Sequence, residues 1–186
     1  MFLNHPSLLR PTASEALLVN DQKLYVPRAE LTLRRWKGIS LANTFGGKPL
    51  IDFGGRPVFA ELCVYELMRL SGWQARWVET YGAPANAPNH FTGWVDDRLG
   101  SQQHDPITEP VIVSALQRTA AGNQGSYAGC WDVVGWNKAD ILFAELKRRK
   151  QDQVRSTQHR WLRAGLEAGL QPDNFLLVEW DFAGEN

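Results

Sequence analysis

The chain has 186 residues, of which 44% are hydrophobic and 22% are charged, a composition typical of one globular domain with a sizeable core. Its formal net charge is zero, so overall charge does not indicate a nucleic acid, a membrane surface or an acidic partner. No apolar run approaches the ~20 residues that cross a bilayer, and nothing near Met1 resembles a signal peptide. We therefore expect a soluble, cytoplasmic protein with no membrane partner.

The two cysteines, Cys63 and Cys130, are far apart and form no Cys-x-x-Cys pair. A structural zinc site needs about four clustered ligands, which this chain does not offer near either residue. We therefore expect two buried thiols.

The first half of the chain divides at about residue 56. Residues 1–56 are interpreted as an N-terminal extension packed on the core, with a basic helix in "RAELTLRRWKG" (28–38). Residues 57–186 are interpreted as the main domain. It begins with a helix over 57–72, in which Pro57 suits the first turn and Gly72 the C-cap. A strand over 73–81 follows, and then a long insertion at about 82–128 that contains a helix over 109–122.

The second half predicts a hairpin, a helix and a last strand. The apolar runs 130–135 and 140–147 flank an Asn137-Lys138 turn, "TQHRWLRAGLEAGL" (157–170) has helical periodicity, and "FLLVEWDF" (175–182) reads as a strand. Leaving the inserted helix aside, the order is αβββαβ. The sequence thus predicts an α/β (α+β) fold.

Charges on the hairpin are unexpected, because the rest of both strands is apolar. Glu145 and Lys147 share a face of their strand, since side chains alternate. A turn centred on Asn137-Lys138 places Asp132 opposite Phe143, hence on that same face and diagonal to Glu145. Two neighbouring carboxylates repel each other unless a cation lies between them. A hard divalent cation would suit them, with the Leu146 carbonyl as a further oxygen ligand. The simpler alternative is a surface ion-pair ladder.

The order of short motifs resembles the VRR-NUC branch of the PD-(D/E)xK nuclease superfamily. That family has Gly-x-Pro-Asp, a hairpin, Glu-x-Lys, a helix with Gln followed by an aromatic-Leu pair, and a closing strand. The resemblance covers about residues 57–182 and departs from the pattern at Trp131, where proline is usual. The matching positions are Gly129, Asp132, Glu145, Lys147, Gln158, Trp161 and Leu162.

The resemblance implies a restriction-endonuclease-like core with a mixed central sheet flanked by helices. It also implies a nuclease dependent on Mg²⁺ or Mn²⁺, with DNA as the expected substrate and RNA left open. Its metal ligands would be Asp132, Glu145 and the Leu146 carbonyl, helped by a glutamate of the first helix, for which we choose Glu61 over Glu66. Lys147 would act on the phosphate with Gln158 in support, although Gln158 could equally cap its helix.

Cations follow the motif closely. Seven cations and a single acid, Asp152, lie between Lys147 and Arg163. Such a cluster suits a phosphate backbone, although charge runs are more often simply solvated. The residues expected to bind nucleic acid are Arg148, Arg149, Lys150, Arg155 and Arg160. A relative of the fold that binds nucleic acid or protein without cleaving it is the rival interpretation. The resemblance also allows a homodimer.

Overall fold

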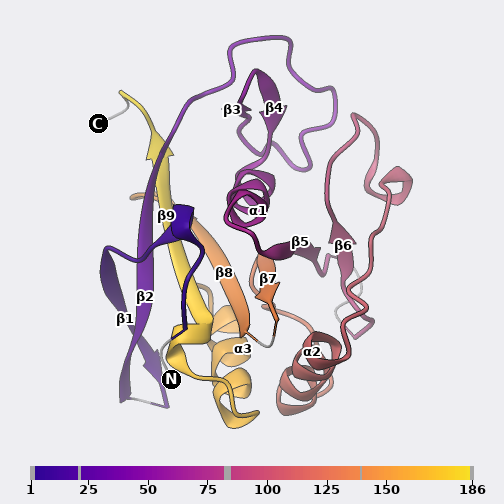
Figure 1. Ribbon diagram of the computed structural model, residues 1–186. Coiled ribbons are helices and arrows are strands. Elements are labelled where there is room, and N and C mark those ends of the chain that lie inside the picture. The colour runs from indigo at the N-terminus through magenta and orange to yellow at the C-terminus, as the bar shows by residue number, and fades with distance from the viewer. Residues whose placement is uncertain (1–2, 21, 82–84, 139, 185–186) are drawn as a thin grey trace.

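A computed structural model describes residues 3–20, 22–81, 85–138 and 140–184 of the protein (Figure 1). Its strands are β1 (Ala13–Val19), β2 (Gln22–Leu33), β3 (Ile51–Phe53), β4 (Arg56–Val58), β5 (Gln74–Glu79), β6 (Asn89–Phe91), β7 (Val133–Asn137), β8 (Asp140–Arg148) and β9 (Phe175–Phe182). Its α-helices are α1 (Ala60–Leu70), α2 (Pro110–Gly122) and α3 (Ser156–Glu167). Short 3-10 turns lie at Ser7–Leu9, Leu99–Ser101 and Pro172–Asn174.

The centre of the fold is a seven-stranded mixed sheet in the order β1-β2-β9-β8-β7-β5-β6. β9 pairs in parallel with β8 on one side and with β2 on the other, and the remaining neighbours are antiparallel. Along the chain the elements α1, β5, β7, β8, α3 and β9 follow one another, with β6 and α2 in the connection between β5 and β7. The predicted mixed α/β class and the order of these elements are confirmed.

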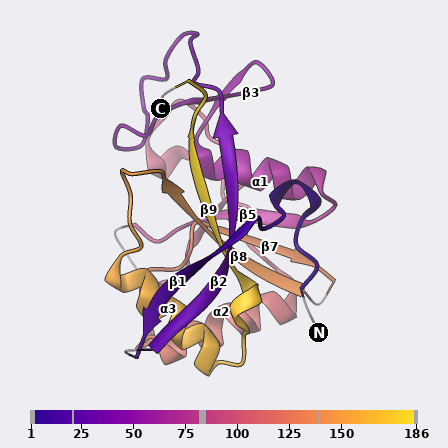
Figure 2. The ribbon, with the colours of Figure 1, turned by 90° about the vertical axis from the view of Figure 1, so that its left-hand side faces the viewer.

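Helices cover both faces of this sheet, which therefore has a hydrophobic core on each side. Both views of the ribbon place α1 on one side and α2 with α3 on the other (Figures 1 and 2). Val133, Leu142 and Ala144 face α1, whereas Val134 and Phe143 face the pair α2 and α3. Strands buried on both faces read as continuous apolar runs, which is why "ILFA" and "FLLV" predicted strands.

The N-terminal region differs from its prediction. The helix expected over 28–38 is not formed, because residues up to Leu33 belong to the strand β2. Its side chains contact both cores, Val26 on the α3 side and Ala29 on the α1 side. Pairing with β9 saturates a backbone edge that a helix would leave open, and this tertiary gain outweighs local helix propensity.

The start of α1 also differs. Pro57 lies in β4, where it pairs with Asp52 of β3, and the helix begins three residues later at Ala60. Gly72 does follow the helix, with a positive φ of 81°, as a C-terminal glycine should.

Both cysteines are buried free thiols, as expected. Burial raises the pKa of Cys63 to about 12, so this thiol is chemically inert at neutral pH. Within the residues that the structure describes, no helix combines the length and the apolar character needed to cross a membrane.

Candidate active site

The β7–β8 hairpin brings Asp132 and Glu145 together. Val133 pairs with Ala144 and Asn137 pairs with Asp140, so the turn lies one residue later than expected. Lys138 at the turn has a positive φ of 55°. Asp132, immediately before β7, is therefore placed beside Glu145 rather than opposite Phe143. A shift of two pairing positions keeps Asp132 on the predicted face, since faces alternate with a period of two.

Glu145 is almost completely buried, with 1% of its surface exposed. Its Oε1 lies 2.8 Å from the Lys147 ammonium and accepts a hydrogen bond of 2.6 Å from the side-chain amide of Gln158. Its Oε2 is buried and has no hydrogen-bond partner among the described residues. Burying a carboxylate oxygen without a hydrogen-bond donor costs free energy. A cation bound to this oxygen would offset that cost.

Gln158 joins the first turn of α3 to both charged residues of β8. Its Oε1 accepts hydrogen bonds from the Lys147 ammonium at 3.1 Å and from the Arg155 backbone N–H at 2.7 Å. The residue therefore serves as the helix cap that the sequence allowed and also holds the two side chains expected at the site. Its amide fixes the distance between Glu145 and Lys147.

Asp132 is held from the backbone of the neighbouring strand. Its Oδ2 accepts a 2.9 Å hydrogen bond from the N–H of Leu146. Burial, followed by repulsion from Glu61, raises the pKa of Asp132, whereas Lys48, the Leu146 N–H and Lys147 lower it. Burial, and then repulsion from Asp132, raises the pKa of Glu145 well above its ordinary value, against the attraction of Lys147. Glu61 thus destabilises the charged form of Asp132, and Asp132 destabilises that of Glu145.

The first helix supplies a third carboxylate. Glu61 in the first turn of α1 is 7% exposed and lines the same cavity, whereas Glu66 pairs with Arg56 at 3.4 Å and does not line it. Glu61 forms a close ion pair with Lys48. The ammonium of Lys48 also lies over the rings of Phe45 and Trp77, at 5.6 and 5.4 Å from their centroids.

These groups surround one open cavity of about 920 Å³. Glu61, Asp132, Glu145, Lys147 and Gln158 line it, together with Glu79 at the end of β5. Burial is the main cause of the raised pKa of Glu79. The carboxylate oxygens are the ligand type that Mg²⁺ and Mn²⁺ prefer, so the donors fit such an ion. Across the described ranges, however, no three acidic, His or Cys side chains form a ready metal-binding cluster.

Sequence reasoning missed Lys48 and Glu79. Glu79 lies near the end of the strand predicted over 73–81 and is the last residue of β5, so its position beside the hairpin could have been inferred from strand order. Val78, its neighbour, donates its N–H to the Asp132 carbonyl at 2.8 Å. Lys48 carries no local signal, because it reaches the site from a loop and its partners lie elsewhere in the sequence.

The predicted basic residues fall into two groups. Arg149 pairs with Glu179 at 3.3 Å and with Glu30 at 3.5 Å, and Arg148 pairs with Asp181 at 3.5 Å. Lys150, Arg155 and Arg160 are exposed, and Arg155 lines the cavity. The first two are thus engaged within the protein, while the other three face solvent.

Two motif residues pack rather than react. Trp131, at the position of the usual proline, is fully buried against the ring of Phe175, with centroids 5.1 Å apart. Gly129 has a φ of 81°, and a Cβ there would lie 2.2 Å from the carbonyl oxygen of Thr157. The loop before Asp132 can therefore contact the start of α3 only through a glycine.

In comparison with known proteins, no family model, no curated protein and no solved structure matches this chain.

Proposed function

We propose that the protein is a metal-dependent nuclease that hydrolyses phosphodiester bonds in DNA, built on a restriction-endonuclease-like core of the VRR-NUC type. The observation that carries the proposal is the buried Glu145, which contacts Lys147 and Gln158 through one oxygen and leaves its other oxygen without a partner among the described residues, beside Asp132. RNA is an alternative substrate under this proposal, and a homodimer is an assembly compatible with the resemblance.

In this proposal each residue has a separate role. Asp132, Glu145 and the Leu146 carbonyl would bind Mg²⁺ or Mn²⁺, with Glu61 as a further ligand. Such an ion, when bound, lowers the pKa of a water and neutralises phosphate charge. The Lys147 ammonium would position the attacking water and stabilise the negative charge that develops on the phosphate. Gln158 would keep Lys147 and Glu145 in register, since it hydrogen-bonds to both.

The basic residues would bind the backbone of the nucleic acid. Lys150, Arg155 and Arg160 are exposed and could contact phosphates directly. Arg148 and Arg149 would have to exchange acidic partners for phosphates, so we assign them a smaller share. Such contacts are largely independent of base sequence.

The test is a panel of labelled duplex, branched and single-stranded DNA and single-stranded RNA, with Mg²⁺ or Mn²⁺. Wild-type protein should cut at least one DNA, and Glu145→Gln and Lys147→Met should each reduce the rate by about 100-fold or more. Lys138→Met is the matched control, because it removes the same charge from the exposed turn of the same hairpin. Wild-type protein that leaves every substrate intact with both metals would refute the proposal.

A non-catalytic nucleic-acid- or protein-binding relative is the second candidate. It is favoured by the ion pair between Lys48 and Glu61 and by the lack of a closed metal cluster among the described residues. Calorimetry separates the two. Only the metalloenzyme should release heat on addition of Mn²⁺, and only its signal should disappear in Asp132→Asn.

A further inference from the structure

The N-terminal strands extend the face of the sheet that carries Glu145 and Lys147. Glu145 pairs with Leu177 of β9, and Leu177 pairs in turn with Arg28 of β2. Side chains at paired positions share a face, so Glu145, Leu177 and Arg28 form one row across three strands. The next row begins with Lys147 and continues with Glu179 and Glu30. The sheet surface beside Lys147 is thus built partly from the region that the sequence presented as an extension.

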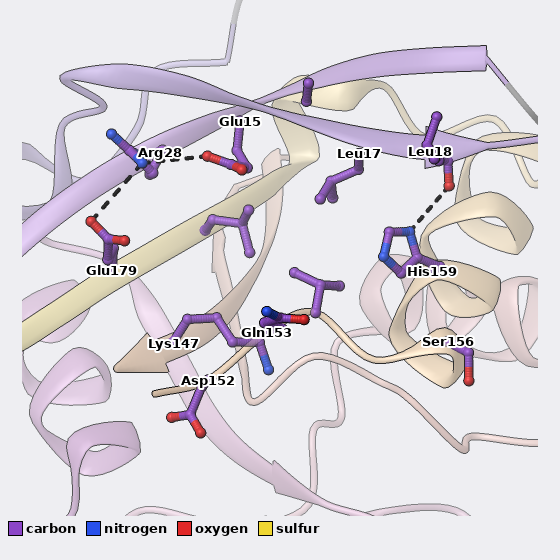
Figure 3. A pocket seen from close by; sticks show the side chains of 13 residues that line it. Glu15, Leu17, Leu18, Arg28, Lys147, Asp152, Gln153, Ser156, His159 and Glu179 are labelled. Atoms are coloured by element: carbon purple, nitrogen blue, oxygen red, sulfur yellow. Dashed lines mark hydrogen bonds and ion pairs between the residues drawn. The ribbon is translucent and has the colours of Figure 1, made fainter. Parts of the chain in front are cut away.

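A second cavity, of about 690 Å³, lies along this surface (Figure 3). The strands β1, β2 and β9 form one wall, and residues 152–159, including the start of α3, form the other. Lys147, Asp152 and Gln153 line this cavity and the active-site cavity alike. A molecule with a phosphate at Lys147 could therefore extend into the second cavity without leaving the protein surface.

The lining is apolar at the base and polar at one side. Leu17, Val154 and Leu177 supply the apolar part, and the first and last of these are buried. On the polar side, Arg28 lies 3.0 Å from Glu30, 3.3 Å from Glu15 and 3.9 Å from Glu179. Figure 3 marks its contacts with Glu15 and Glu179. The Nε of Arg28 is buried and has no hydrogen-bond partner among the described residues. The cavity wall therefore presents a hydrogen-bond donor, the Arg28 guanidinium, next to carboxylate acceptors.

We propose that this cavity binds one unstacked nucleobase of the substrate, adjacent to the phosphate at Lys147; the adjacency rests on the nuclease function proposed above. The volume is large enough to admit a nucleobase together with its sugar. Glu15, Asp152 and Glu179 outnumber Arg28 and Lys147, so the lining disfavours a phosphate and suits a neutral group that donates hydrogen bonds. Guanine fits best, because its carbonyl oxygen can accept from Arg28 while its N–H and amino groups donate to a carboxylate.

The consequence is a preference for unpaired substrate. A base in the cavity has left its stack, and the cost of unpairing is lowest in a single strand or at a frayed end. The enzyme should therefore cut single-stranded or frayed DNA faster than a fully paired duplex, with a guanine favoured beside the cut.

Two variants test the cavity, each with a control on β2. Val154→Trp narrows the cavity with a large ring and Arg28→Met removes the donor. Tyr25→Trp and Lys23→Met make equivalent changes at exposed positions of β2 whose side chains point to the other face. Because nucleosides carry no phosphate and need no metal, binding of deoxyguanosine, deoxyadenosine, deoxycytidine and thymidine can be followed by NMR titration in EDTA.

Deoxyguanosine should bind most tightly, with a Kd of about 1 mM. Val154→Trp and Arg28→Met should each weaken it about tenfold or more, while both controls bind as wild type. If circular dichroism shows that one of the two variants is unfolded, weakened deoxyguanosine binding by the other, folded variant still supports the cavity. Absence of nucleoside binding, or equal binding by wild type and two folded cavity variants, would overturn the inference.

Cleavage assays keep this inference separate from the proposed function. If wild type cuts DNA and Val154→Trp keeps the same ratio of single-strand to duplex rates, the subsite is refuted and the nuclease stands. If deoxyguanosine binds as described but no nucleic acid is cut with either metal, the nuclease fails and the base pocket stands.

Discussion

At the scale of single residues, the site is defined by carboxylates that are not fully neutralised by the protein itself. Glu145 is buried and Asp132 beside it is half-buried, and their hydrogen bonds come from one backbone N–H, one amide and one ammonium. A cavity that holds carboxylates in this state stores unfavourable electrostatic energy, which a divalent cation would relieve.

Because of this electrostatic cost, we expect the free energy of unfolding of the metal-free protein to depend on pH. The pKa of Glu145 is raised by burial and by Asp132, so the folded protein holds that proton more tightly than the unfolded chain. At low pH the Glu145 carboxyl is protonated in both the folded and the unfolded state, so its burial does not reduce stability through a buried charge. Stability should fall as pH rises from about 4 through the raised pKa, because ionising Glu145 then opposes folding.

Glu145→Gln removes that ionisation. In EDTA at pH 8 we expect this variant to be more stable than wild type by about 1 kcal/mol or more, and the difference should shrink toward pH 4. Urea denaturation at the two pH values measures it. A variant that is less stable than wild type at pH 8 would show that the Lys147 ion pair outweighs the burial of the charge.

Lys48 should compete with the metal. Its ammonium forms an ion pair with Glu61, and although burial opposes the charge, attraction to Glu61 and Asp132 raises the pKa of Lys48 overall. Lys48→Met should therefore tighten Mn²⁺ binding about tenfold, a gain of about 1.4 kcal/mol. Calorimetry measures it, with Lys37→Met, an exposed position in the same segment, as control. Weaker binding in Lys48→Met would show that Lys48 organises the acids instead.

The residues of the site were predictable to the extent that they lie in one stretch of chain. Asp132, Glu145, Lys147 and Gln158 fall within 27 positions. Strand alternation placed the first three on one face, and the motif order added Gln158. Lys48 and Arg28 were not predictable, because they reach their cavities through the pairing of strands and loops from distant parts of the sequence.

At the scale of elements, Gly129 sets the approach of the hairpin to α3. The glycine has a positive φ, and a Cβ added to it would lie 2.2 Å from the Thr157 carbonyl oxygen, so no side chain fits. Gly129→Ala should lower the free energy of unfolding by about 3 kcal/mol, from left-handed backbone strain and from the clash together.

Gly125→Ala is the matched control for that substitution. Its φ is 74°, but nothing lies within 4 Å of the added Cβ, so only the backbone strain of about 1 kcal/mol remains. Chemical denaturation of both variants gives the difference. Equal losses would show that α3 moves freely to admit the methyl group.

The elements themselves were predicted well wherever an apolar pattern was decisive. β8, β9, α2 and α3 follow from runs and periodicities in their own sequences. The second half of β2 was predicted as part of a helix over 28–38, because its residues carry helix-forming side chains and its β identity comes from its partner β9. Pairing over such distances has no local signature.

At the scale of the whole molecule, the basic residues fall into two groups, although the net charge of the protein is zero. Arg148 and Arg149 connect β8 to acids of β9 and β2, while Lys150 and Arg160 stand exposed. The second pair should therefore govern binding to nucleic acid.

Lys150→Ala and Arg160→Ala should each weaken DNA binding and reduce the slope of log K against log salt by about 0.7–0.9. Arg149→Ala should change that slope much less and instead destabilise the fold, because Glu179 and Glu30 each lose one of their cationic partners and keep Arg28. Fluorescence anisotropy over a salt series, with catalysis blocked by EDTA, measures the slopes. A larger change in slope for Arg149→Ala would reverse this assignment.

The parallel pairing of β2 with β9 also orders events during biosynthesis. β2 is synthesised long before β9. Arg28 can therefore pair with Leu177 only after most of the chain has been made. Closing so long a loop is slow, and the unpaired strand is open to wrong partners meanwhile. The wall beside Lys147 is consequently among the last parts to assemble, and a nascent chain cannot hold a finished groove.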